Sequence, residues 1–103
     1  MDLNTLVLSK QGRLLACLQE NLRIPSVEGA PEADAPYGTE VRRSLEHVLE
    51  AAAVMGFRTC NVDNHVGWCE YGEGDEMVAV LGHMDVVPAG DGWSHDHWDG
   101  EIQ

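Results

Sequence analysis

A histidine and an aspartate, separated by a single residue, follow the most apolar run in the sequence. His83 and Asp85 follow residues 77–81 after a single glycine, and Pro-Ala-Gly at 88–90 then turns the chain. Alternate residues of a strand point to the same side, so both side chains are expected on one face at the end of a strand. A neutral imidazole binds zinc well, and its second N–H is commonly donated to a carboxylate. The pair therefore favours a metal ligand, His83, oriented by Asp85.

The same two residues have a structural interpretation. A histidine at the end of a strand can be satisfied by a neighbouring carboxylate with no metal nearby. His-x-Asp is a short pattern, and its spacing alone favours this second interpretation. The surrounding sequence has to decide between the two.

Two helices are expected ahead of this pair. Apolar residues recur at helical spacing over residues 3–22, and Pro25 disfavours helical backbone in the residue before it. A second apolar stripe covers residues 41–55, and Gly56 suits a left-handed cap at its end. Residues 27–36, rich in proline, alanine and acidic side chains, are expected to form a loop.

Strands are expected after the second helix. The hydrophobic period changes to two, and residues 57–62 and 66–71 predict a hairpin that turns at Asp63-Asn64. Residues 77–81 are continuously apolar, which predicts a third strand covered on both faces. The fold class is therefore α/β, with two helices followed by three strands.

Composition excludes several functions. The chain has 103 residues, enough for one small domain, and 44% of them are apolar. The formal net charge of −12 disfavours nucleic acid and anionic membranes as partners, because both require clustered basic residues. We find no signal peptide and no run long enough to cross a bilayer. The three irregularly spaced cysteines are expected to be reduced thiols in a cytoplasmic protein.

The motif VLGHMDVVPAGDGW at residues 80–93 resembles a known family. It is similar to the first metal-binding motif of the dinuclear-zinc metallopeptidases that include aminoacylases, desuccinylases and dipeptidases. Bacterial Xaa-His dipeptidases of the dipeptidase V type are the most similar. For these the resemblance covers nearly the whole chain from Leu14 onward, including LRIPSV at 22–27, YGTEVRRSLEHVLEAAAVMGF at 37–57 and NVDNHVGWCEYGEGDE at 61–76.

This resemblance implies that residues 1–103 form the N-terminal part of a catalytic domain with a mixed central sheet. The rest of that domain and an inserted lid or dimerisation domain would be absent. His83 would ligate one of two zinc ions, which manganese or cobalt could replace, and Asp85 would be catalytic and orient the histidine. A metal-bridging water, deprotonated by a glutamate, would cleave the amide bond of a dipeptide or small peptide. The remaining ligands and that glutamate would lie beyond residue 103, so the isolated segment is expected to be inactive.

Other interpretations stay open. The substrate could be an N-acyl amino acid, or the segment could be a non-catalytic interaction module with at most one weak metal site. His95 and His97, beside two aspartates, could bind zinc or could belong to a solvated loop that binds metal adventitiously. Trp93 and Trp98 are interpreted as packing residues, although either could line a substrate pocket. Ser26 is interpreted as structural because no base accompanies it. The oligomeric state is left open.

Overall fold

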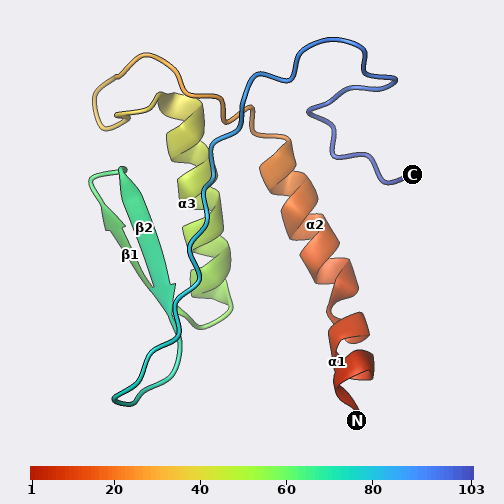
Figure 1. The fold of residues 1–103 in the computed structure, drawn as a ribbon, viewed down its shortest axis with the longest axis vertical. Coiled ribbons are helices and arrows are strands. Elements are labelled where there is room, and N and C mark those ends of the chain that lie inside the picture. Colours follow the sequence, from red (N-terminus) through yellow and green to blue (C-terminus); the bar gives the residue numbers. More distant parts are fainter. The chain divides into compact units, whose positions relative to one another are not determined.

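The computed structural model describes all 103 residues. Its elements, in chain order, are α1 (Leu3–Ser9), α2 (Gln11–Leu22), α3 (Thr39–Val54), β1 (Arg58–Val62) and β2 (Val66–Glu70) (Figure 1). The chain forms two compact units, one made of Met1–Ile24 with Ala89–Gln103 and the other of Pro25–Pro88. The α/β class is confirmed. None of the helices combines the length and apolarity that a membrane crossing requires.

In the first unit, the single helix expected over residues 3–22 is divided in two. The backbone N–H of Lys10 donates to the carbonyl of Val7, three residues back, which tightens the last turn of α1 and ends it. Gly12, the least favourable residue of α2 for a helix, is the second residue of that helix, two positions after Lys10. At the start of α1, the carboxylate of Asp2 accepts the backbone N–H of Thr5, and this hydrogen bond holds the pKa of Asp2 below its usual range.

The remainder of the first unit is the segment 89–103, which has no helix or strand of its own. The side-chain amide of Gln19 donates to the carbonyl of Gly100 over 2.9 Å, and Nε of Arg23 donates to the carbonyl of Asp99 over 3.0 Å. These two bonds hold the segment against α2.

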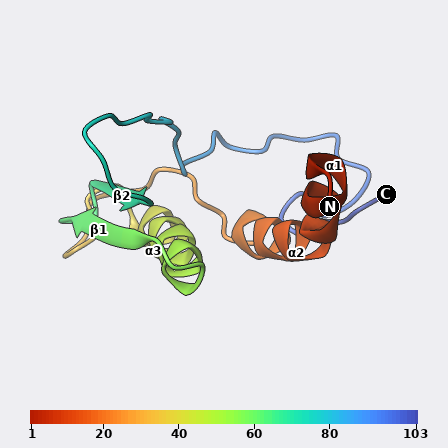
Figure 2. The same ribbon diagram turned by 90° about the horizontal axis from the view of Figure 1, so that it is seen from below.

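The second unit is built from α3 and a hairpin that lies along one side of it (Figure 2). The strands β1 and β2 are antiparallel, with a register that runs from Arg58 opposite Glu70 to Val62 opposite Val66. Asp63 and Asn64 both adopt positive φ, as a two-residue type I′ turn requires. The hairpin and its turn were both predicted correctly.

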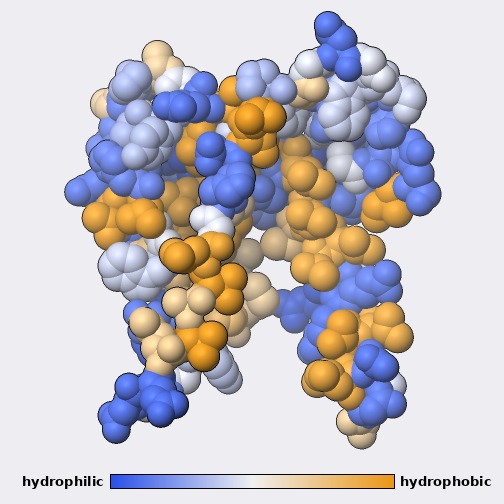
Figure 3. Space-filling view, in the orientation of Figure 1, coloured by the Kyte–Doolittle hydropathy of each residue, from blue (hydrophilic) through white to orange (hydrophobic).

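The third strand is not formed. Residues 77–81 belong to no sheet, and the only sheet consists of β1 and β2. Val78, Val80 and Leu81 are 95–97% exposed, so the prediction of a strand covered on both faces is wrong for this chain. A strand needs a neighbour to pair its backbone groups, and here none lies beside these residues. Figure 3 shows hydrophobic surface over this extended segment, which Figure 1 draws in front of α3.

The start of α3 depends on a glycine. Gly38 is the N-cap residue of α3 and has φ 96° and ψ 158°, a region open almost only to glycine. A Cβ at this position would also lie 3.1 Å from the backbone of Gly29, and backbone atoms cannot move aside as the end of a side chain can. Together these two constraints fix residue 38 as glycine.

We expect Gly38→Ala to lower the free energy of unfolding by about 1–3 kcal/mol, the usual cost of one strained backbone conformation. Urea denaturation of the full-length protein measures this. Gly29→Ala is the matched control, because its Cβ would have only an ordinary contact at 3.8 Å. Equal stability of the two variants would contradict the assignment of strain to residue 38.

Candidate functional site

The segment that carries the His-x-Asp pair is held by a second segment far away in the sequence. Val27 and Val86 form a parallel bridge. The backbone N–H of Val86 donates to the carbonyl of Ser26 over 3.0 Å, and the hydroxyl of Ser26 donates to the carbonyl of Met84 over 2.9 Å. The end of the apolar run is therefore anchored although the run itself has no strand partner.

Within this anchored segment the structure brings His83 and Asp85 together. Nδ1 of His83 lies 2.9 Å from the backbone carbonyl oxygen of Asp85 and 3.4 Å from its carboxylate Oδ1. A carbonyl oxygen can only accept, so the shorter contact is a hydrogen bond when Nδ1 carries the proton. In the neutral ring Nε2 then keeps its lone pair. The main acceptor for the ring is thus the backbone of Asp85, and the carboxylate lies slightly farther away.

The imidazole of His83 is accessible. Its side chain is 79% exposed, and that of Asp85 is 57% exposed. Both residues line a cavity of about 490 Å³ in the second unit, together with residues of α3 and β2. An accessible ring beside a cavity leaves room for a metal ion and a substrate, which a ring that faced away from any cavity would not.

The chain supplies only part of a metal site. No group of three or more histidine, cysteine, aspartate or glutamate side chains is placed so that it could hold a metal ion. Zinc sites in proteins use three or four protein ligands. The donors that are present fit one ligand position, through Nε2 of His83.

The histidines near the C-terminus lie in the first unit and contact aromatic rings. The ring of Trp93 lies 6.4 Å from that of His95 and 5.5 Å from that of His97, and the ring of His97 lies 5.0 Å from that of Trp98. Nδ1 of His95 is also 3.0 Å from Nε2 of Gln103. The structure therefore places the rings of Trp93 and Trp98 against histidine rings, and Trp93 is 53% exposed.

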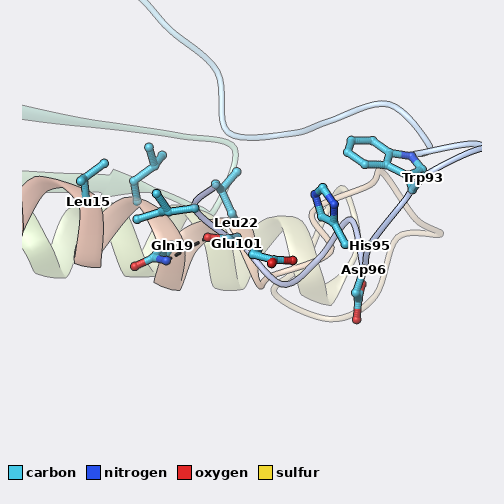
Figure 4. A pocket seen from close by; sticks show the side chains of 10 residues that line it. Leu15, Gln19, Leu22, Trp93, His95, Asp96 and Glu101 are labelled. Carbon is cyan, nitrogen blue, oxygen red and sulfur yellow. Dashed lines mark hydrogen bonds between the residues drawn. The ribbon is translucent and has the colours of Figure 1, made fainter.

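His95 and Trp93 also line a second cavity, of about 300 Å³, within the first unit. Figure 4 shows Leu15, Gln19 and Leu22 on α2 with Glu101 close to them, and Trp93, His95 and Asp96 farther along segment 89–103. The apolar lining of this cavity comes from three leucines of α2 together with Trp93 and Ile102, and the acidic residues are not gathered around the histidine as a ligand set.

Ser26 is the residue whose part in this site the sequence did not reveal. It is 3% exposed, and its hydroxyl bonds a carbonyl 58 residues away, so its interpretation as structural is consistent with its burial. Nothing in the sequence near Ser26 indicates that its bonding partner is the peptide next to Asp85.

The chain was compared with protein-family models and with curated proteins. No protein-family model matches the chain. It is 43% identical over 99 residues to "Putative dipeptidase YtjP" of Bacillus subtilis, a match that covers 94% of this chain and 21% of the relative. It is 38% identical over 106 residues to "Beta-Ala-Xaa dipeptidase" of Lactobacillus delbrueckii subsp. lactis, covering 99% of this chain and 23% of the relative.

A third relative, "Putative dipeptidase SH1171" of Staphylococcus haemolyticus, is 41% identical over 88 residues, covering 84% of this chain and 19% of the relative. The chain thus spans about a fifth of the length of the curated relatives it matches. Identity at this level over nearly the whole chain is expected only among homologues. The chain therefore belongs, as a segment, to the family of these bacterial dipeptidases.

Proposed function

We propose that this chain is the N-terminal part of the catalytic domain of a zinc-dependent dipeptidase, and that His83 is one of its metal ligands. The observation that carries the proposal is the hydrogen-bonding and the accessibility of the His83 imidazole. Nδ1 lies 2.9 Å from the carbonyl oxygen of Asp85, which favours the tautomer protonated at Nδ1 with its lone pair on Nε2, and the 79% exposed ring lines a cavity. The relatives named dipeptidases support the reaction class.

In this proposal each residue of the pair has its own task. His83 binds zinc through Nε2, and Asp85 orients the ring through its backbone carbonyl and its carboxylate. Zinc held there would supply Lewis acidity toward the peptide carbonyl and would activate a water molecule for attack on it. The carboxylate of Asp85, 3.4 Å from Nδ1, also stabilises the positive charge that metal binding induces on the imidazole.

The substrate class follows from the relatives' names. We propose dipeptides, and one relative's name specifies a β-alanine residue at the first position. We also propose a cytoplasmic location, in keeping with the free thiols of Cys17, Cys60 and Cys69.

The experiment is a hydrolysis assay of the full-length protein after loading with zinc, manganese or cobalt. The panel contains α-dipeptides, dipeptides beginning with β-alanine, tripeptides and N-acetyl amino acids. We expect metal-dependent release of amino acids from dipeptides and a loss of activity with a chelator. Preference for N-acetyl amino acids would identify a deacylase instead, and no turnover of any substrate with any metal would reject the enzyme.

The isolated segment 1–103 serves as the companion sample in that assay. It offers one ligand position and no set of three ligands, so we expect no measurable hydrolysis from it. Activity of the segment equal to that of the full-length protein would contradict the proposal that the remaining ligands lie beyond residue 103.

A further inference from the structure

The peptide group between Asp85 and Val86 is bonded at both of its ends. Its carbonyl oxygen lies 2.9 Å from Nδ1 of His83. Its N–H donates to the backbone carbonyl of Ser26 over 3.0 Å. One rigid plane therefore connects Ser26 to the imidazole, because a peptide group is planar and its C=O and N–H point in opposite directions.

The side chain of Ser26 fixes the preceding peptide group as well. Its hydroxyl donates to the carbonyl of Met84 over 2.9 Å. The two peptide groups that flank the Cα of Asp85 are thus both bonded to the same residue. The backbone dihedrals of Asp85 determine where its carbonyl points, and Ser26 restrains them from both sides.

Burial makes this restraint effective. Ser26 is 3% exposed, so its hydroxyl meets little competition from water, and an unmade bond there would be costly. The imidazole that depends on this restraint is, in contrast, 79% exposed, with no close packing to hold it. The orientation of His83 therefore depends on hydrogen bonds.

We infer that Ser26 is a positioning residue for the metal ligand. It sets the peptide plane whose carbonyl accepts Nδ1–H of His83, and so keeps Nε2 as the nitrogen available to a metal ion. The metal-binding part of this inference rests on the proposed function, whereas the choice of protonated nitrogen does not. Ser26 itself touches neither metal nor substrate.

The test uses three variants of the full-length protein. Ser26→Ala removes the hydroxyl, and Ser26→Cys keeps nearly the same shape with a much weaker donor. Ser44→Ala is the matched control: Ser44 is a fully buried serine on α3, and it does not line the cavity that His83 lines. Thermal unfolding of each variant measures the loss of stability that comes with removing any buried hydroxyl.

The first readout is independent of activity. Side-chain ¹H–¹⁵N correlation spectra of the chelator-treated protein report which nitrogen of His83 carries the proton, with the resonance assigned by its absence in His83→Gln. We expect the Nδ1–H form to dominate in wild type and in Ser44→Ala, and to decrease through Ser26→Cys to Ser26→Ala. If Ser26→Ala does not fold, the comparison of Ser26→Cys with wild type is the test.

The second readout is zinc affinity, measured by competition with a chromophoric chelator, together with kcat and KM on a dipeptide. For Ser26→Ala we expect a dissociation constant raised about 10-fold, at the lower end of the range for residues that orient a ligand, and a fall in kcat rather than a rise in KM. Ser44→Ala should bind zinc as wild type does.

The outcomes separate this inference from the proposed function. If the fraction of His83 protonated at Nδ1 changes with the residue at position 26 in a protein that hydrolyses no dipeptide, that result supports the positioning role of Ser26 and rejects the dipeptidase. An unchanged tautomer in a folded Ser26→Cys or Ser26→Ala protein overturns the positioning role, whatever the activity. So does a wild-type His83 that carries its proton on Nε2.

Discussion

The full-length His83→Ala protein is expected to lose close to one equivalent of bound zinc and nearly all of the proposed dipeptidase activity. The substitution removes the only ligand atom that we assign in this segment, the exposed Nε2. Changing a residue that merely orients a ligand costs about 10–100-fold in affinity or activity, and removal of a ligand should exceed that range. Zinc content after dialysis and kcat/KM on a dipeptide measure the two effects.

His97→Ala is the control for that experiment. It removes a histidine that lies against Trp93 and Trp98 and belongs to no set of ligands. We expect it to retain full zinc content, which would show that His97 is not a zinc ligand. If His83→Ala keeps wild-type zinc content and rate, His83 is not a ligand and the proposed site is wrong.

The second large effect is expected for Asp85. The Asp85→Ala protein should fold and retain some zinc, because the backbone carbonyl that accepts from Nδ1 at 2.9 Å remains in place. It loses the carboxylate 3.4 Å from the same nitrogen, and with it the charge that stabilises a metal-bound imidazole. We expect kcat to fall about 10–100-fold, measured at saturating zinc.

Two further variants make the Asp85 result specific. Asp85→Asn keeps an acceptor oxygen without the charge, so we expect it to fall between wild type and Asp85→Ala. Asp75→Ala changes the net charge of the protein by the same amount from a turn that is not bonded to the site, and should leave the rate unchanged. Wild-type rates in Asp85→Ala would show that the backbone carbonyl alone orients the ring.

Local interactions explain which elements could be predicted. The helix α3 and the β1–β2 hairpin are each formed by contacts between residues close in sequence, so the apolar stripe and the two-residue turn were enough to locate them. The division of the first helix at Lys10 was missed, because hydrophobic periodicity continues through a one-residue break.

Residues 77–81 show where this kind of reasoning fails. A run of apolar residues favours burial of a segment. A strand also needs a neighbouring strand whose backbone N–H and C=O groups pair with its own. Such a partner comes from a distant segment, which the local pattern does not specify, and none is present beside these residues. The pattern therefore predicted a covered strand where the chain forms an exposed segment without a strand partner.

The sequence by itself determined that an imidazole and a carboxylate share one side of an extended segment, because residues two apart in such a segment project together. Only the tertiary structure decided which oxygen holds Nδ1 of His83, and it is the backbone carbonyl of Asp85 at 2.9 Å. It also decided that Ser26, 58 residues from Met84, bonds the peptides on both sides of that aspartate. The physical reason is that a hydrogen bond between distant segments depends on the tertiary fold that brings them together. The local sequence around either residue does not specify its partner.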